Sequence, residues 1–360
     1  MVKSIIEMDK NELLDYLKEN PDEFKSLYTK ENISKINWDY IPEKLIDKNE
    51  AILENFDWDY ISACQKLSES FIAKHKRWVW WYYISKYQKL SENFIAEHKD
   101  LVDWYYISEY QKLSESFITK YKDLVDWIPI SRYQKLSENF IAEHKDLVAW
   151  HSISMLQKLS ESFIAKYKDL VDWYCISEYQ NLSEEFIEKH KDLVIWCYIS
   201  KYQKLSEAFI TKHKDLVDWN CISAYQKLSE EFIKKYKDYI DIYLVNDNWL
   251  NKSTEFKKEA VVKTGKYECH KDYFIAYKGI RSDRYSKFNF QYQYMPGETY
   301  ECFSDGSDNE GSFGLSVWTE EKAAGYCNEL VVRCKIYYED VTRVVHDDYK
   351  IRCSKITILD

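Results

Sequence analysis

Tryptophan returns at a fixed interval along half of the chain, and this spacing constrains the fold more than any other feature. Every interval is 23 residues long, and Ile242 occupies the position that would follow the last tryptophan. A constant period of this length indicates a stacked array of structural repeats. The recurring residues are Trp58, Trp81, Trp104, Trp127, Trp150, Trp173, Trp196 and Trp219.

The sequence of each repeat predicts two helices, and a serine caps the first. Ser114 is a natural N-cap, while Leu113 and Ile118 stand at the two positions of a hydrophobic staple. An apolar stripe follows at helical spacing, which predicts a helix that runs past residue 121. The stripe consists of Phe117, Ile118, Tyr121, Leu124 and Val125.

The second predicted helix is short and begins at the tryptophan. Asp126 precedes Trp127 as its cap, and the helix ends near the YQK triplet. Pro129 agrees with this start, because proline is tolerated in the first turn of a helix and breaks an interior. A hairpin this small cannot bury its own apolar stripe. The sequence therefore predicts an α-solenoid in which neighbouring repeats stack.

Glycine divides the chain, since the first 264 residues contain none and all seven follow. Together with the repeat period, this boundary divides the chain into four predicted parts. Residues 1–57 are expected to form N-terminal capping helices with a diverged repeat, and residues 58–241 tandem 23-residue helical repeats. A capping repeat follows over 242–265, and a small domain over 266–360. The N-terminal helices are expected near Asp9 and Pro21, with the diverged repeat at Trp38. The last helix of the solenoid is expected between a Ser253 cap and Gly265.

The C-terminal region has short alternating and β-branched segments separated by glycine turns, which predicts an α+β domain. One helix is expected over residues 319–329, capped by Thr319. Strands are expected over 272–279, 285–294, 298–303, 330–338 and 349–359. The fold class is thus mainly α, an α-solenoid followed by a small α+β domain.

Composition limits the functional classes. The net charge of −10 speaks against a protein that neutralises nucleic-acid phosphates. The N-terminus lacks the pattern of a secretion signal, and no window has the roughly 18 apolar residues of a membrane span. The nine cysteines include no CxxC pair, and the four in the repeats occupy varying positions, which favours reduced thiols in the cytoplasm.

The repeats differ mainly at the two positions after each tryptophan and at the position after Ile-Ser. Invariant positions are expected to form the core between repeats and variable ones to lie outside. Neutral drift explains such variation, and so does a binding face tuned to a partner, where tyrosine is an effective anchor. The candidate partner-binding residues are Tyr82, Tyr83, Tyr105, Tyr106, Ile128, His151, Tyr174, Tyr198, Asn220, Lys86, Glu109 and Arg132.

No catalytic, cofactor-binding or metal-binding residues are predicted. The chain has no P-loop, GxGxxG, HExxH or GxSxG motif. One repeat position holds five histidines, but other repeats have tyrosine there, so aromatic packing is expected rather than a metal ladder. The five are His75, His98, His144, His190 and His213.

The repeat pattern YQKLSE-FI-KHKDLVDW resembles a repeat found in proteins of giant viruses, phages and AT-rich bacteria. The segments AYKGIRSDRYS, SFGLSVWTEEKAAGYC, VVRCKIYYEDV and HDDYKIRCSKITIL resemble an uncharacterised C-terminal module of phage-type repeat proteins. Neither family brings an established activity. The resemblance implies a viral or prophage protein that acts on a host component.

A second resemblance is to the strand and helix order of ADP-ribosyltransferases. That family places an Arg or His on the first strand, a Ser or Thr on the second, and a late catalytic Glu. Here Lys278 stands at the first place and Ser316 near the second, while Asp347 and Asp348 are the acids nearest the third. These departures speak against catalysis.

The sequence as a whole predicts a non-catalytic, protein-binding repeat protein. The expected partner is a host protein or complex, for example a defence complex such as a CRISPR effector, which the chain would inhibit or adapt. Direct nucleic-acid binding and a membrane are not expected. The alternatives are an ADP-ribosyltransferase-like C-terminal domain targeted by the repeats, and a self-associating structural repeat protein. The oligomeric state stays open.

Overall fold

The computed structural model of the protein describes residues 16, 43–48, 58–245, 249–288, 290–307, 313–345 and 349–360. They belong to two compact units, 1–180 and 181–360, which we take in turn. The predicted fold class is confirmed: helical repeats precede a small domain built on an antiparallel sheet. The N-terminal helices expected near Asp9 and Pro21, and the diverged repeat at Trp38, lie outside the described residues.

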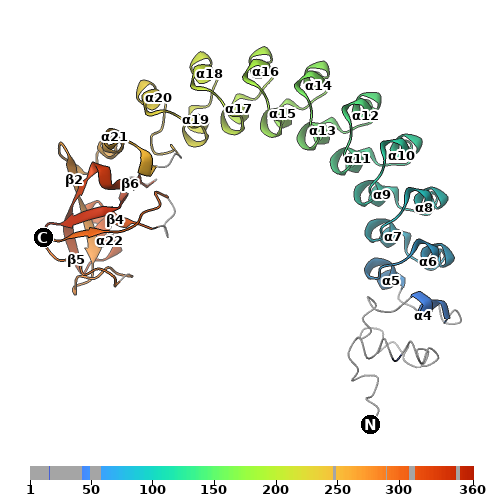
Figure 1. Cartoon of the computed structure of the whole chain (residues 1–360), viewed down its shortest axis with the longest axis horizontal. Coiled ribbons are helices and arrows are strands. Elements are labelled where there is room, and N and C mark those ends of the chain that lie inside the picture. Colours follow the sequence, from blue (N-terminus) through green and yellow to red (C-terminus); the bar gives the residue numbers. More distant parts are fainter. Residues whose placement is uncertain are drawn as a thin grey trace, which may run out of the picture. The chain divides into compact units, whose positions relative to one another are not determined.

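The first unit alternates two kinds of short helix, which form two rows in Figure 1. We call one kind the tryptophan helices, because each begins at a tryptophan, and the other the serine-capped helices, because a serine precedes each as its N-cap. The α4 helix (Glu43–Lys48) precedes them. The tryptophan helices are α5 (Trp58–Cys64), α7 (Trp81–Tyr87), α9 (Trp104–Tyr110), α11 (Trp127–Tyr133), α13 (Trp150–Leu156) and α15 (Trp173–Tyr179). The serine-capped helices are α6 (Glu69–Lys74), α8 (Glu92–Glu97), α10 (Glu115–Lys120), α12 (Glu138–Glu143) and α14 (Glu161–Lys166).

The predicted caps are confirmed, whereas the predicted length of the first helix is wrong. The Ser114 hydroxyl accepts the backbone N–H of Phe117, and the Asp126 carboxylate accepts that of Ile128. The α10 helix ends at Lys120, however, and the chain continues as a turn. Leu124 consequently leaves the expected apolar stripe and is 44% exposed. The backbone turns away because the N–H groups of Leu124 and Val125 both bond the carbonyl of Tyr121.

The invariant glutamine at the end of each tryptophan helix binds the backbone of the preceding repeat. The Gln134 amide donates to the carbonyls of Ser108 and Gln111, and its oxygen accepts the N–H of Leu113. Gln88, Gln111 and Gln157 repeat this pattern. These side chains are buried, so they satisfy polar backbone groups that would otherwise lack partners. The invariant glutamine therefore lies in the core, as predicted, although part of that core is polar. The prediction is wrong for other recurring positions, since Ser114 and Lys135 are exposed.

Other invariant residues make similar contacts. The Ser108 hydroxyl accepts the N–H of Asp126 in the next repeat and donates to the Trp104 carbonyl. The Glu115 carboxylate accepts both the N–H and the hydroxyl of Ser137, at 2.5 and 3.0 Å. The Ser108–Asp126 and Glu115–Ser137 pairs each join adjacent repeats. The Ile-Ser and Ser-Glu motifs thus define how one repeat stacks on the next.

The second unit begins with further repeats and ends in the sheet. Its helices are α16 (Glu184–Lys189), α17 (Trp196–Tyr202), α18 (Glu207–Lys212), α19 (Trp219–Tyr225), α20 (Glu230–Lys235), the 3-10 helix η4 (Trp249–Asn251) and α21 (Thr254–Thr264). The predicted ends of α21 are confirmed. The Ser253 hydroxyl accepts the N–H of Phe256, and Gly265 ends the helix in the left-handed region with a φ of 65°.

The C-terminal sheet is antiparallel in every described pairing and has the strand order β3-β8-β5-β2-β4-β7-β6, with β1 paired to β2. Its elements include α22 (Glu320–Tyr326) and the 3-10 helix η5 (Tyr338–Asp340). The strands are β1 (Glu268–Cys269), β2 (Tyr273–Ile280), β3 (Thr299–Glu301), β4 (Leu315–Trp318), β5 (Leu330–Tyr337), β6 (Val341–Val344), β7 (Lys350–Cys353) and β8 (Lys355–Ile358). The α22 helix packs on β2, where a Cβ at Gly279 would lie 2.1 Å from the Ala323 carbonyl oxygen.

Three expectations for this domain need correction. The segment 285–294 forms only an isolated bridge between Tyr285 and Gln293 among its described residues, and the rings of Tyr292 and Tyr294 lie 6.2 Å apart. The single strand expected over 349–359 divides at Ser354, and its halves pair with different neighbours. Thr319 precedes α22 as predicted, but its side chain makes no cap hydrogen bond.

Candidate functional site

An exposed row of tyrosines lies at the ends of the tryptophan helices. Each of its members in the first unit is about half exposed. We call this set the tyrosine row: Tyr87, Tyr110, Tyr133, Leu156 and Tyr179. In the second unit, Tyr202 and Tyr225 hold the same repeat position. Burial does not explain why six of these seven positions hold tyrosine. The row is therefore the strongest candidate for an interaction surface.

The two variable positions after each tryptophan differ in exposure, which corrects the expectation that variable residues lie outside. The first is exposed in every repeat, with Tyr105 at 48% and Ile128 at 63%. The second is half-buried in most repeats, and Pro129 and Cys175 are buried. The second position faces the first position of the preceding repeat: Tyr106 donates a 2.9 Å hydrogen bond to the Tyr82 hydroxyl. That bond raises the pKa of Tyr106 to about 12.

The candidate residues of α7 and α9 surround one lysine. The Lys86 ammonium lies 5.1 Å from the ring centre of Tyr87 and 5.2 Å from that of Tyr106. Tyr82 and Tyr110 complete the cage at 6.0 and 5.8 Å. Contact with Tyr87 holds the pKa of Lys86 above its usual value. We define the tyrosine patch as Tyr82, Tyr87, Tyr105, Tyr106, Tyr110 and Tyr133 with Lys86.

The charged candidates follow one another along the same edge. Lys86, Glu109 and Arg132 occupy the same position of α7, α9 and α11, and the Arg132 guanidinium lies 5.2 Å from the Tyr133 ring centre. In the second unit Lys201 lies over Tyr202 at 4.8 Å and over Tyr225 at 5.2 Å. Alternating charge does not form the continuous positive stripe that a nucleic-acid backbone requires.

The remaining candidates do not form part of the tyrosine patch. His151 and Tyr174 lie further along the first unit, whereas Tyr198 and Asn220 belong to the second. Tyr83 is half-buried and stacks on Tyr87, with ring centres 6.1 Å apart. Tyr198 stacks on Tyr202 in the same way at 5.9 Å. Their predicted role in binding a partner stays a prediction.

The histidine position of the serine-capped helices is used for packing, as predicted. The His144 ring lies 4.3 Å from the Phe140 ring centre and 5.2 Å from that of Trp127. Its Nδ1 is 3.0 Å from the Phe140 carbonyl oxygen. Tyr121 takes the same place against Phe117 and Trp104 in a neighbouring repeat. One aromatic ring thus replaces another.

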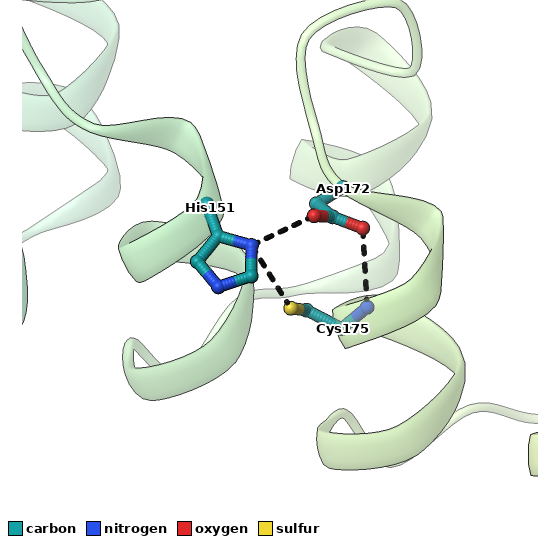
Figure 2. Close-up of side chains that lie close together, drawn as sticks. All are labelled: His151, Asp172 and Cys175. Atoms are coloured by element: carbon teal, nitrogen blue, oxygen red, sulfur yellow. Dashed lines mark hydrogen bonds and ion pairs between the residues drawn. The ribbon is translucent and has the colours of Figure 1, made fainter.

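One group of side chains in the described residues has the composition and spacing to hold a metal ion. Figure 2 shows His151, Asp172 and Cys175 facing one another from α13 and α15, with their donor atoms within 4.8 Å of one another. Burial, followed by the charge of Asp172, raises the pKa of Cys175 to about 11. Sequence reasoning missed this group because it treated the cysteine positions as scattered. Cys175 and Cys221 in fact share one repeat position.

The sheet domain contains a cavity of about 860 Å³ beside β2 and β4. Aromatic side chains, among them Tyr294, Trp318 and Tyr326, line it together with two lysines, Lys278 and Lys350. The Lys278 ammonium is buried and donates to the Ser316 carbonyl at 3.0 Å. It lies 5.0 Å from the Tyr294 ring centre. No carboxylate is among the described lining residues, and burial lowers the pKa of Lys278.

We expect Lys278 to make folding stability depend on pH with a defined sign. Its folded-state pKa is lowered, so between that value and the ordinary value of 10.5 the unfolded chain binds a proton that the folded chain does not. Stability must therefore rise with pH through this window. Urea unfolding of wild type and Lys278→Met from pH 7 to about 10 measures it: the stability of wild type relative to the variant should increase. A constant or decreasing difference would contradict the lowered pKa.

The residues of the transferase resemblance are only partly brought together. Lys278 reaches the backbone of Ser316, so these two positions are neighbours on β2 and β4. The acids nearest the third catalytic place, Asp347 and Asp348, lie outside the described residues.

Comparisons with protein-family models, with curated proteins and with solved structures found no match. Among the described helices, none is both long and apolar enough to cross a lipid bilayer. The candidate sites therefore rest on the geometry of this chain.

Proposed function

We propose that the protein is a non-catalytic binding protein that holds a polypeptide partner along the exposed edge of its tryptophan helices. The observation that carries this proposal is the tyrosine row, in which nearly every repeat presents a half-exposed tyrosine at the same position. Tyrosine offers a large contact area and a hydroxyl at a small cost in side-chain entropy. A stacked array repeats that contact every 23 residues, which suits an extended partner segment.

The tyrosine patch supplies the centre of the proposed contact in the first unit. Its rings are already ordered by ring contacts and by the Lys86 cage, so less freedom is lost when a partner binds. Variable residues around the patch, such as Ile128 and Arg132, would set specificity. The partner is proposed to be a host protein, for instance part of a defence complex such as a CRISPR effector, on the sequence resemblance alone.

Two matched double variants of the full-length protein test this function. Tyr105→Ala with Tyr110→Ala removes two rings of the patch. Leu101→Ala with Leu124→Ala removes two side chains that are each 44% exposed in the adjoining turns. In pull-downs from nuclease-treated host lysate, we expect one stoichiometric protein to be retained by wild type and by the leucine variant. The tyrosine variant should bind it at least about tenfold more weakly.

Equal retention by both double variants with unchanged helicity would contradict a role for the tyrosine patch. The alternatives give different results with the same preparations. For a transferase-like C-terminal domain, Lys278→Met would abolish the biological effect and NAD consumption while capture persists. A self-associating repeat protein would show a mass that rises with concentration in light scattering.

A further inference from the structure

The group of His151, Asp172 and Cys175 joins two adjacent repeats at the variable positions. His151 is the second residue of α13, Asp172 caps α15, and Cys175 lies in the first turn of α15. His151 Nδ1 is 2.8 Å from Asp172 Oδ2 and 3.6 Å from Cys175 Sγ. Figure 2 shows the imidazole edge directed at both partners. Three different donor types therefore converge on one point.

The two separations from His151 are close to those of a tetrahedral metal site, and the donor atoms of Asp172 and Cys175 lie within 4.8 Å of each other. Bonds of about 2.3 Å to sulfur and about 2.05 Å to nitrogen or oxygen place the S and N donors roughly 3.5 Å apart, and the N and O donors about 3.3 Å apart. The S–N separation already agrees. The N–O separation needs to widen by about half an ångström, which a small rotation of His151 provides, since 65% of its side chain is exposed.

The carboxylate of Asp172 is oriented for such a role by the helix that it caps. Its Oδ1 accepts the backbone N–H groups of Tyr174 and Cys175, at 2.9 and 3.4 Å. Oδ2 is then directed toward the His151 imidazole, as Figure 2 shows. Hydrogen bonds that fix the direction of a ligand are a regular part of metal sites.

The other repeats of the first unit serve as an internal comparison. They bring the same three positions together, but with side chains that cannot form a mixed N, O and S site. The corresponding sets are Asp59, Trp80 and Tyr83; Tyr82, Asp103 and Tyr106; Tyr105, Asp126 and Pro129; and Ile128, Ala149 and Ser152. The geometry therefore belongs to the repeat, while the mixed imidazole, carboxylate and thiolate set belongs to this junction of the first unit; the same three positions in the second unit include Cys197, Asp218 and Cys221, which have no imidazole.

We propose that His151, Asp172 and Cys175 bind a divalent transition metal of the Zn²⁺ class. A thiolate excludes hard ions such as Mg²⁺ and Ca²⁺, and a mixed imidazole, carboxylate and thiolate set suits Zn²⁺. Coordination releases the thiol proton of Cys175, and the imidazole binds through an unprotonated Nδ1 while its N–H lies on Nε2, so the site holds one divalent cation, two anions and a neutral ring. Three protein ligands leave a fourth position open toward solvent on the His151 side, and the ion fixes α13 to α15.

Cobalt titration of the reduced full-length protein tests the site. We expect Co²⁺ to produce a near-ultraviolet thiolate charge-transfer band with visible bands of tetrahedral cobalt, and Zn²⁺ to displace it. Cys175→Ser should abolish the charge-transfer band. His151→Tyr should weaken Co²⁺ binding at least about tenfold, and it should fold because Tyr82 and Tyr105 occupy this position in other repeats.

Cys221→Ser is the matched control, since Cys221 holds the same repeat position two repeats later. This variant should retain the band that Cys175→Ser loses. The proposal is overturned if wild type gives no thiolate–cobalt band, or if the band survives Cys175→Ser undiminished. It is also overturned if His151→Tyr, with unchanged helicity, binds Co²⁺ as tightly as wild type.

Discussion

Replacing Gln134 with alanine should destabilise the repeats around α11 by about 3–5 kcal/mol, the largest effect we expect from one side chain. The substitution removes three hydrogen bonds and leaves the carbonyls of Ser108 and Gln111 and the N–H of Leu113 without this partner. Each unsatisfied buried group costs about 1–3 kcal/mol. Gln134 is only 6% exposed, so water cannot easily replace the lost partners.

Hydrogen exchange locates this effect better than a global midpoint, because repeats interact mainly with their neighbours and open locally. The amide of Leu113 should lose protection by two orders of magnitude or more, at about 1.4 kcal/mol for each tenfold change. Lys135→Ala, at the exposed neighbouring position, should leave exchange unchanged. Gln134→Glu should also destabilise, since it retains the acceptor but sets a carboxylate against two carbonyls. If Leu113 keeps its wild-type protection in Gln134→Ala, the hydrogen bonds of this glutamine contribute little to the stability of the repeats.

The sequence predicts the repeat and its caps well because both are local. Ser114 and Asp126 are read from their own neighbours, and the structure places both as caps. The partners of Gln134 are not local, since its bonds reach back 21 to 26 residues. Periodicity shows that this glutamine recurs but not what it binds. The predicted length of α10 is wrong because the apolar spacing continues through Leu124, whereas the helix itself ends before that residue.

The candidate sites were predicted less well than the fold. Exposure of Tyr82, Tyr105 and Ile128 follows from their variability, but the burial of Cys175 does not. A comparison of one repeat position at a time does not show which side chains meet. In the structure, the first residue after the tryptophan of one repeat faces the second residue after the tryptophan of the next. Read with that 24-residue offset, His151 and Cys175 are partners, as are Tyr82 and Tyr106. The order of the sheet strands is likewise set by contacts distant in sequence.

Replacing Arg343 with methionine should loosen the sheet domain from the last repeat of the second unit, at a cost of about 2–4 kcal/mol. The Arg343 guanidinium donates to the carbonyls of Val245 and Tyr243, at 3.0 and 3.3 Å, and lies 5.2 Å from the Trp249 ring centre. Hydrogen bonds from a charged donor contribute about 1.5–3 kcal/mol each. The Val245 carbonyl keeps its bond from Trp249 Nε1, which limits the loss.

Contacts from α21 limit what Arg343→Met can loosen. The Lys257 ammonium of α21 donates to the Glu339 carbonyl of η5 at 2.8 Å, and Lys258 donates to the Lys271 carbonyl at 2.7 Å, so the sheet domain stays attached to α21 when Arg343 is replaced. We therefore expect loosening around β6 rather than unfolding of the sheet. Limited proteolysis should cleave Arg343→Met between α20 and α21 several times faster than wild type. Arg333→Met, at an exposed position of β5, should be cleaved at the wild-type rate. Equal rates for Arg343→Met and Arg333→Met would mean that α21 alone holds the sheet domain to the repeats.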